Sequence, residues 1–288
     1  MRFAYMIMAH NEPYVLNKLI EMLDYPNNDL FIHVDKNSTS IDSEKLKTKK
    51  AQLTVIQSRS VSWGGCSQIN CILDLLSEAL KSTHDYYHLI SGQDLPIKSN
   101  AERVTFFKKN NGKEFIGVTQ DWASSSSIAH RYELHWFWQD KIGKKKNLIW
   151  LLSRIISRTE MNVGYKRKNG DICFYGGPVW FSITEKAAAY LLSQGEWIRK
   201  RFKNTICCDE IYAQTIICNS FLKSHIYEAD DSHAQCMRYV RFNGESPFVL
   251  DLEDFDNLIH SDCMFARKFG TETQKEKELV DKIYDLYK

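Results

Sequence analysis

The chain has 288 residues, of which 43% are hydrophobic and 12% are aromatic, which is enough to build one α/β domain around a sizeable core. Charged residues make up 26% and the formal net charge is only +2, so no overall field favours nucleic acid as a partner. Basic clusters lie at 141–146, 199–203 and 238–268, and a solvated face is the simplest interpretation of each.

No stretch approaches the roughly 18 uncharged apolar residues of a membrane-spanning helix, and the apolar run after Met1 is too short for a signal peptide. We therefore expect a cytoplasmic protein without a transmembrane segment. Any association with the membrane is expected to be peripheral, at its inner face. The eight cysteines form no CxxC pair and match no zinc-site spacing, so we expect reduced thiols buried as small hydrophobes.

The first third of the chain alternates apolar strands with helices. The predicted strands are 3–9, 29–35, 51–56 and 86–91, and the predicted helices are 14–23 and 67–81. This order implies a mostly parallel, Rossmann-like sheet flanked by helices, in which functional groups gather at the carboxyl ends of the strands. His10, Asp35 and Asp94 follow three of these strands, so we expect them at that edge.

The segment from about 117 to 170 is less regular, and it holds Trp122, the serine run 124–127 and a basic helical stretch. A long excursion of this kind commonly carries a binding surface, which makes Arg131 and Tyr132 candidate ligand contacts. Regular structure resumes with a turn and strand at 176–182, and further helices are predicted at 185–192, 211–221 and 273–287. No repeat or linker interrupts the chain, so we predict one domain.

Several nucleotide-binding and hydrolase motifs are missing from the sequence. No GxGxxG follows the first strand, and neither a Walker A sequence, a GxSxG elbow nor a helical HExxH is present. These absences argue against a dinucleotide-binding enzyme, a P-loop ATPase, an α/β-hydrolase and a zinc protease of that type. Carboxylates and basic residues at the ends of elements remain as the candidates for chemistry.

Asp209 and Glu210 stand at the predicted start of the helix 211–221, where the helix dipole favours ionised carboxylates. A carboxylate in that position is able to accept a proton from a hydroxyl group as a general base. The alternative is structural, because Asp209 also fits an N-cap that binds the first backbone amides. Caps are far commoner than catalytic bases, so the residues alone favour the cap.

Other candidates also have two interpretations. Asp35 fits a hydrogen bond to a nucleobase or ribose, or a solvated strand end. Trp63-Gly64 brings the backbone close to a ligand, or forms a turn with a core tryptophan. Asp94 is a candidate catalytic residue, or part of an Asp-x-Pro turn.

Basic residues near the C-terminus are the candidates for binding a diphosphate. Arg267 and Lys268 stand between aromatic residues, and Arg238 and Arg241 precede them in the chain. Arginine forks and lysine point charges both suit phosphate groups.

The order of these segments resembles that of the core-2/I-branching β-1,6-N-acetylglucosaminyltransferase family (glycosyltransferase family 14), which includes the peptide O-xylosyltransferases. The resemblance extends over nearly the whole chain. The segments that carry it are 3–10, 31–36, 62–65, 88–98, 175–181, 209–215 and 265–269.

The resemblance implies a GT-A type fold and transfer of a sugar with inversion at the anomeric carbon. It assigns the role of base to Glu210, with Asp209 as a cap or orienting partner. Members of the family lack the metal-binding Asp-x-Asp motif, so no metal or other cofactor is expected. Basic side chains near the C-terminus hold the diphosphate instead, and Lys268 matches one of them. Arg238, Arg241 and Arg267 remain candidates for its partner.

The resemblance also divides the single domain into a nucleotide-binding part at about 1–116 and an acceptor-binding and catalytic part at about 117–288. The residues expected near the nucleotide sugar, besides the basic ones, are His10, Asp35, Trp63, Gly64 and Asp94. Those expected near the acceptor are Arg131, Tyr132, Gly177 and Trp180.

The expected donor is a UDP-sugar, with N-acetylglucosamine as the first choice of sugar and xylose as the alternative. The expected acceptor is a glycan or a lipid-linked glycan. The sequence departs from animal members in lacking their N-terminal anchor, stem and cysteine pattern, which suggests a bacterial relative that serves surface polysaccharide synthesis. Two other hypotheses remain: a metal-dependent transferase that uses Asp35 or Asp94 as a ligand, and an inactive carbohydrate-binding protein on the same fold.

Overall fold

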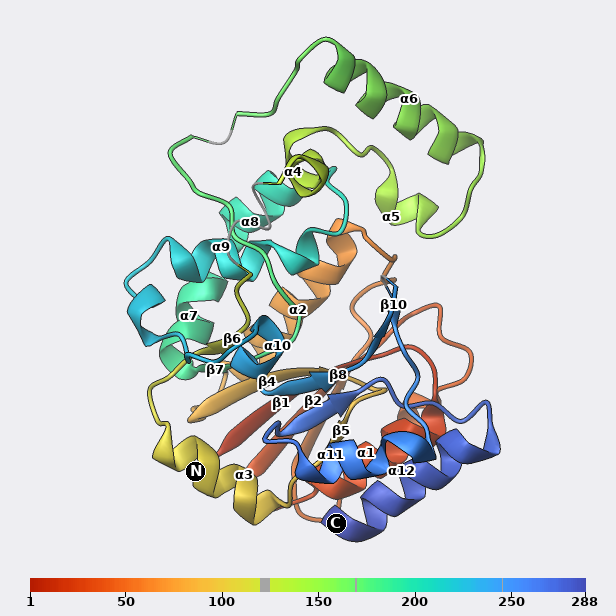
Figure 1. Ribbon diagram of the computed structural model, residues 1–288, viewed down its shortest axis with the longest axis vertical. Helices are drawn as coiled ribbons and strands as arrows, with labels where there is room; N and C mark the ends of the chain where they lie inside the picture. Colours follow the sequence, from red (N-terminus) through yellow and green to blue (C-terminus); the bar gives the residue numbers. More distant parts are fainter. Residues whose placement is uncertain (120–124, 169, 245) are drawn as a thin grey trace.

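The computed structural model describes residues 1–119, 125–168, 170–244 and 246–288 (Figure 1). Trp122 and Ser124, which were singled out in the irregular middle segment, lie outside these residues. The centre is a six-stranded sheet in the order β3-β2-β1-β4-β7-β6. Its strands are β1 (Phe3–Ala9), β2 (Asn28–Val34), β3 (Gln52–Ile56), β4 (Tyr86–Ser91), β6 (Phe115–Ile116) and β7 (Phe181–Thr184).

The first four strands of this sheet are parallel, whereas β7 runs antiparallel to both β4 and β6. This mostly parallel sheet, flanked by helices, is the α/β, GT-A type arrangement expected from the sequence. The strands β1 and β4 have the predicted bounds, because runs of mostly apolar and aromatic residues of that length are typical of strands buried on both faces. Strands from 1–116 and from 117–288 share the sheet.

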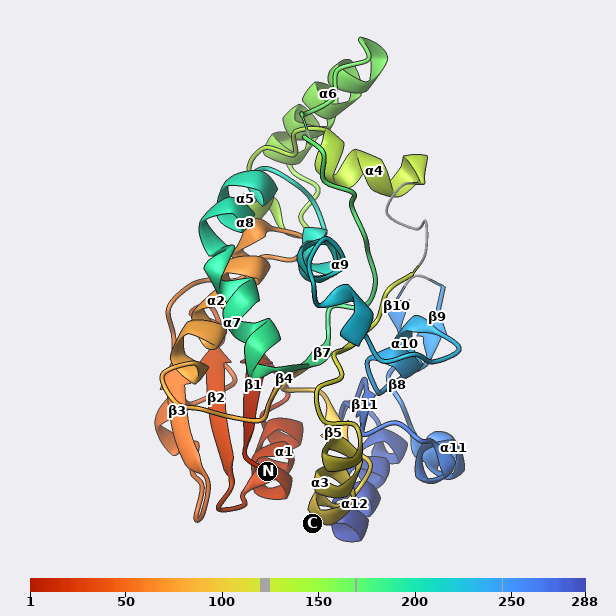
Figure 2. The same ribbon diagram turned by 90° about the vertical axis from the view of Figure 1, so that its left-hand side faces the viewer.

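Helices cover both faces of the sheet (Figure 2). Alternate residues of β1 point to opposite faces, so Phe3, Tyr5 and Ile7 join one core cluster, and Ala4 and Met6 join the other. The first cluster packs against α1 (Pro13–Leu23), α3 (Asn100–Lys109) and α12 (Gln274–Tyr287). The second packs against α2 (Cys66–Ala79), α7 (Glu185–Ser193), α8 (Gly195–Phe202) and α9 (Tyr212–Cys218).

A smaller three-stranded sheet lies beside the loop that follows β4. It has the order β5-β11-β8, formed by β5 (Leu95–Pro96), β11 (Phe265–Arg267) and β8 (Arg238–Val240). The hairpin β9 (Phe242–Asn243) and β10 (Ser246–Pro247) and the short helices α10 (Ser232–Gln235) and α11 (Phe255–His260) complete this C-terminal region. The backbone amide of Phe269 donates to the carbonyl of Gln93 at 2.8 Å, which fixes the end of β11 to that loop.

The middle segment forms α4 (Ser126–Glu133), α5 (Gln139–Ile142) and α6 (Leu148–Asn162). Both ribbon views place α6 at the end of the molecule farthest from α1 and α12. Among the described residues, no helix combines the length and apolarity needed to cross a bilayer. Five of the eight cysteines are buried as expected, but Cys173 is exposed, and Cys207 and Cys263 are intermediate.

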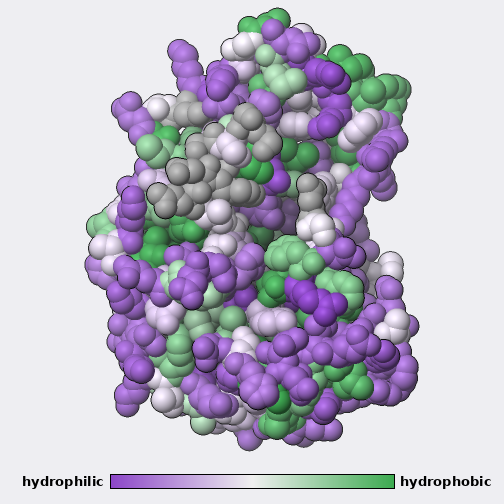
Figure 3. Space-filling model, viewed as in Figure 1, coloured by the Kyte–Doolittle hydropathy of each residue, from purple (hydrophilic) through white to green (hydrophobic). Residues whose placement is uncertain are grey.

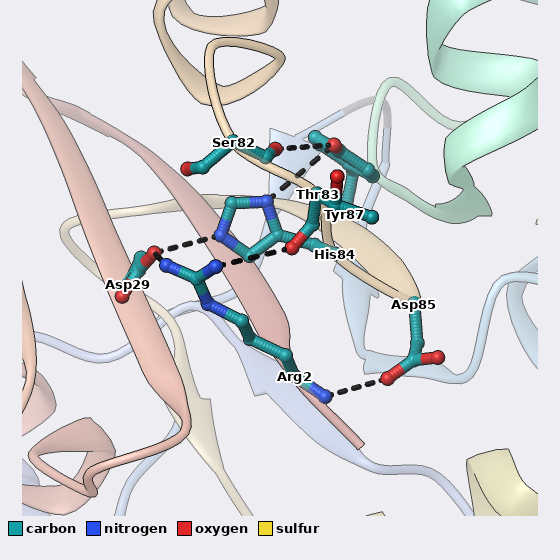
Figure 4. A network of polar contacts seen from close by, with 7 residues as sticks. All are labelled: Arg2, Asp29, Ser82, Thr83, His84, Asp85 and Tyr87. Carbon is teal, nitrogen blue, oxygen red and sulfur yellow. Dashed lines mark hydrogen bonds and ion pairs between the residues drawn. The ribbon is translucent and has the colours of Figure 1, made fainter.

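The amino ends of the strands are tied together by polar side chains (Figure 4). Asp29 at the start of β2 accepts from Arg2 at 2.5 Å and pairs with His84 at 2.8 Å. The backbone amide of Arg2 donates to Asp85 at 2.6 Å, so the residues before β1 and β4 are bonded directly. Asp29 and His84 are almost fully buried, so this network forms a clamp at one edge of the sheet.

Candidate active site

The residues expected at the carboxyl ends of the strands do lie at one edge of the sheet. His10 follows β1 and Asp35 follows β2, and the amide of Asp35 donates to the carbonyl of Ala9 at 2.9 Å. The amide of Gly92, after β4, donates to the carbonyl of Met8 at 2.9 Å. The three strands are parallel neighbours, so their carboxyl ends meet there, as in other open α/β sheets.

Asp35 and Asp94 are both buried and shape the loops at this edge. The carboxylate of Asp35 accepts from the backbone amides of Asn37 at 2.7 Å and Val61 at 2.9 Å, which ties the β2 loop to the segment before Trp63. Asp94 accepts from the amide and hydroxyl of Ser91 at 3.0 and 2.7 Å, which closes the loop after β4. Asp35 is therefore not the solvated strand end that the sequence offered as an alternative, and the turn at Asp94 runs back to Ser91 rather than forward to Pro96.

Glu210 forms an ion pair with Arg131 at this end of the molecule. Oε2 of Glu210 lies 2.7 Å from Nη1 of Arg131, and the two side chains are 39% and 27% exposed. The helix expected to begin at residue 211 is split, with a 3-10 turn at Cys208–Glu210 followed by α9 from Tyr212. Arg131, from α4, thus reaches a carboxylate held on a tight turn.

Asp209 is buried beside Glu210 and does not cap α9, because the first residues of that helix receive no side-chain cap hydrogen bond. The predicted cap is therefore wrong, since the 3-10 turn separates Asp209 from the helix start. Burial raises the pKa of Asp209 to about 7, and the charge of Glu210 acts in the same direction. Two adjacent carboxylates thus have different surroundings, one dry and one open to solvent.

A short stretch of chain joins this carboxylate pair to the basic residues. The amide of Gly177 donates to the carbonyl of Glu210 at 2.9 Å. Three residues later, the guanidinium of Arg267 stacks on the ring of Trp180, and Cζ of Arg267 lies 4.3 Å from the ring centre. The four residues 177–180 span roughly 11 Å at most. A Cβ atom at Gly177 would overlap the carbonyl oxygen of Gly117, so this backbone contact requires glycine.

Arg267 presents unused donors in a mostly buried position. Its side chain is 13% exposed, and Nη1 lies 3.7 Å from Asp94, outside hydrogen-bonding range. Nε and Nη1 are buried without a hydrogen-bond partner among the described residues. Buried guanidinium donors normally have partners, so these two nitrogens leave positive charge at Arg267 that an anionic ligand nearby would balance.

Three more residues lie close to Arg267: Lys268, His10 and Lys144. Desolvation lowers the pKa of Lys268, and the charges of Arg267 and Lys144 add to the effect. Desolvation also lowers the pKa of His10, followed by the charge of Lys268. Three cations that affect one another in this way form a positive site, which we call the basic cluster: Lys144, Arg267 and Lys268.

Lys144 is exposed, as expected for the basic run 141–146, but the sequence does not show which groups lie beside it. Its ammonium lies 5.6 Å from the ring centre of Trp63, whose side chain is 51% exposed. Gly64 adopts a φ of +68°, and its carbonyl accepts from the amide of Cys207 at 2.9 Å. The Trp63-Gly64 turn therefore contacts both the basic cluster and the segment that carries Glu210.

Three predicted ligand contacts are placed elsewhere. Arg238 is 1% exposed, and its guanidinium donates to the carbonyls of Leu89 and Phe181 at 3.2 and 2.9 Å, so it holds β4 and β7 together rather than a diphosphate. Arg241 is paired with Asp254. Tyr132 is 4% exposed and stacks on Phe174 with 4.0 Å between ring centres, so it belongs to the core and not to an acceptor surface.

Among the described residues, no group of three or more His, Cys, Asp and Glu side chains is arranged to hold a metal ion. Asp35 and Asp94, the carboxylates of the metal-dependent hypothesis, are occupied by backbone amides and by Ser91. The charged groups described at this end of the sheet are instead a carboxylate pair, a guanidinium with free donors, and two lysines.

Comparisons with curated proteins find xylosyltransferases. Xylosyltransferase 2 of Rattus norvegicus is 24% identical over 310 residues, which cover 99% of this chain and 34% of that protein. Xylosyltransferase oxt of Drosophila pseudoobscura pseudoobscura is 23% identical over 279 residues, which cover 88% of this chain and 30% of that protein. The chain spans about a third of the length of these curated relatives.

Among solved structures, the apo form of mouse xyloside xylosyltransferase 1 aligns with 94% of this chain and 98% of its own, at 11% identity and a TM-score of 0.39. A family model described as "Core-2/I-Branching enzyme" matches residues 3–247, a range that contains Glu210 but ends before Arg267 and Lys268. The match covers most of the sequence, and the chain belongs to the Core-2/I-Branching enzyme family.

Proposed function

We propose that this protein is a glycosyltransferase that moves a sugar from a UDP-sugar to a hydroxyl group of a glycan acceptor, with inversion and without a metal ion. The observation that carries the proposal is the carboxylate pair, in which Asp209 is buried and Glu210 is open to solvent beside Arg131. The basic cluster, connected to this pair through residues 177–180, supports it. A protein that only binds carbohydrate needs no base at such a position.

Glu210 is the proposed base. Burial raises the pKa of Asp209 to about 7, so at neutral pH Asp209 retains a proton in a large share of molecules. The negative charge of the pair then resides mainly on Glu210, which is the accessible member. Carboxylates that are made different by their surroundings are typical of sites where one of them handles a proton.

In the proposed reaction the acceptor hydroxyl gives its proton to Glu210 while its oxygen attacks the anomeric carbon. The bond between that carbon and the UDP oxygen breaks, and its electron pair leaves with the diphosphate. Arg131 positions the Glu210 carboxylate before the acceptor arrives, at 2.7 Å. General base assistance of this kind typically contributes about 10²–10⁴-fold to the rate.

The basic cluster is proposed to bind the diphosphate and to stabilise the charge that develops on it. Arg267 offers two unpartnered donors in a mostly buried position, and Trp180 and Asp94 hold its plane in place. Lys268 adds positive charge in a partly desolvated position, and the exposed Lys144 adds to it from the solvent side. Preorganised donors in such a site are worth about 3 kcal/mol each in comparable enzymes.

N-acetylglucosamine is proposed as the donor sugar, for synthesis of a bacterial surface polysaccharide, and xylose is the second candidate. The two curated relatives described above are xylosyltransferases, which favours including UDP-xylose. A panel of UDP-sugars measured by thermal shift separates these donors, because a ligand that binds only the folded state raises its apparent stability.

The test of the proposed function is Glu210→Gln. We expect UDP binding measured by calorimetry to be retained, while transfer or hydrolysis of the UDP-sugar falls by at least about 10²-fold. Glu278→Gln, which removes the same charge from an exposed position on α12, serves as the matched control and should keep full turnover. Turnover close to wild type in Glu210→Gln would remove Glu210 from the mechanism.

The two other hypotheses are separated from this proposal by simple additions to the same assay. Activity that persists in EDTA supports the metal-free mechanism, whereas a strict manganese requirement would favour a metal-dependent transferase. A protein that binds UDP-sugars but neither transfers nor hydrolyses any donor in the panel would match the inactive carbohydrate-binding protein.

A further inference from the structure

Helix α6 has its polarity reversed relative to an ordinary surface helix. Ser153 and Ser157 face the body of the protein and are 1% and 3% exposed, and the hydroxyl of Ser157 donates to the carbonyl of His135 at 2.7 Å. The apolar residues Leu148, Leu151, Leu152 and Ile155 are instead 71%, 48%, 46% and 52% exposed. A surface helix normally turns its apolar stripe inward.

These four residues lie on one side of the helix, because positions three and four apart in sequence are neighbours on a helical surface. We call them the α6 apolar face: Leu148, Leu151, Leu152 and Ile155. Both ribbon views place α6 at the outer end of the molecule, away from the sheet. In the space-filling view, hydrophobic residues gather at the corresponding upper right corner (Figure 3).

Basic residues surround the α6 apolar face. Lys144, Lys145 and Lys146 are exposed immediately before the helix, Arg158 is exposed within it, and Lys166 is exposed after it. The acidic residue of the helix, Glu160, is paired with His135 at 2.7 Å and partly withdrawn from solvent. Exposed apolar side chains flanked by cations are the composition of helices that lie in the interface of an anionic membrane.

We propose that α6 docks the protein on the surface of a bilayer that contains anionic lipids. The α6 apolar face enters the boundary between headgroups and acyl chains, and the flanking lysines contact the headgroups. A second copy of the chain is a poorer occupant, because a symmetric pairing of two α6 helices would bring the same basic residues toward each other. An anionic lipid surface complements both the apolar side chains and the charge.

The docking helix is connected to the candidate active site through α5. His135 pairs with Glu160 of α6, and Gln139 of α5 donates to the carbonyl of Trp63 at 3.0 Å. Lys144, at the start of the lysine run, lies over the Trp63 ring. Given the proposed function, on which this step rests, docking would hold the segments of Trp63 and Glu210 near the membrane, where an acceptor carried on a lipid is available.

The test is flotation of the purified protein with vesicles of phosphatidylcholine alone or mixed with phosphatidylglycerol, with no substrate present. We expect the wild-type protein to bind the mixed vesicles. The double variant that carries Leu152→Glu and Ile155→Glu should bind them at least about tenfold more weakly than the wild type. Lys145→Gln with Lys146→Gln should weaken binding to the mixed vesicles by about fivefold per lysine. Leu286→Glu, an equally exposed position on α12, is the matched control and should bind as wild type.

Wild-type protein that ignores the mixed vesicles, or a double variant that binds them undiminished, would overturn the proposal. So would a dimer, seen by light scattering, that the double variant dissociates, because a second copy would then cover the face. Circular dichroism checks that the variants are folded, and Ile155→Ser provides a milder change expected to weaken binding in the same direction. Vesicle binding needs no transferase activity, so this result and the test of Glu210 fail or succeed separately.

Discussion

Asp209→Asn removes an ionisable group that folding buries beside a second carboxylate. The ordinary pKa of this side chain is 3.8, and burial raises it to about 7 in the folded protein. Each whole step in pKa corresponds to about 1.4 kcal/mol, so ionised Asp209 costs the native state at most about 4 kcal/mol relative to the unfolded chain. Asparagine has nearly the shape of the protonated acid and carries no such cost.

The direction of the pH effect follows from the raised pKa of an acid. Below pH 3.8 both states hold the proton, and between pH 3.8 and about 7 only the native state does, so the contribution of Asp209 to stability falls as pH rises. Above about pH 7 the loss is complete. We therefore expect the stability advantage of Asp209→Asn over the wild type to grow by about 3 kcal/mol between pH 5 and pH 7 and to level off by pH 8.

Urea unfolding of both proteins at pH 5, 6, 7 and 8 measures this difference, and comparing two proteins at each pH cancels the titration of other groups. Asp230→Asn, at an exposed position, is the control and should show no comparable trend. A difference that stays flat or shrinks toward pH 8 would mean that Asp209 is ionised in the native protein. The reason for assigning the negative charge of the pair to Glu210 would then be lost.

Two further predictions concern the groups around this pair. Lys268→Ala should weaken the binding of UDP by about 10–100-fold, because it removes one charge-assisted contact with the diphosphate. Calorimetry measures this affinity, and an unchanged value would remove Lys268 from the diphosphate site. Gly177→Ala should lower the free energy of unfolding by about 1–3 kcal/mol, because its methyl group has no room against the Gly117 carbonyl. Gly195→Ala, whose methyl would meet only the flexible end of Arg199, should be nearly neutral in the same denaturation assay, and equal losses in both would contradict the packing argument.

The sheet could be predicted well from the sequence because its signals are local. Runs of mostly apolar and aromatic residues define β1 and β4, and parallel order alone brings His10 and Asp35 to one edge. The helix at Glu210 was less predictable, since the left-handed backbone of Cys207 and the 3-10 turn depend on contacts with Gly64. Local pattern cannot show that a turn will be forced between an acidic pair and its helix.

The basic residues were the hardest to assign, because sequence shows a charge but not what surrounds it. Arg238 becomes a core residue only because β8 runs beside β11, where its guanidinium meets carbonyls from β4 and β7. Lys144 is the converse case, since its run of lysines is exposed as expected but the sequence does not show that one of them lies over Trp63. Both outcomes depend on segments that are distant in sequence.

The clamp formed by Arg2, Asp29 and His84 fastens the sheet at the edge opposite to Glu210 and the basic cluster. Strand order is thus secured by groups that lie away from Glu210 and the basic cluster. Loops at the other edge are free to lengthen, shorten or change composition without loosening the framework that carries them. Such a division separates the part of the chain that fixes the order of the strands from the loops that carry Glu210 and the basic cluster.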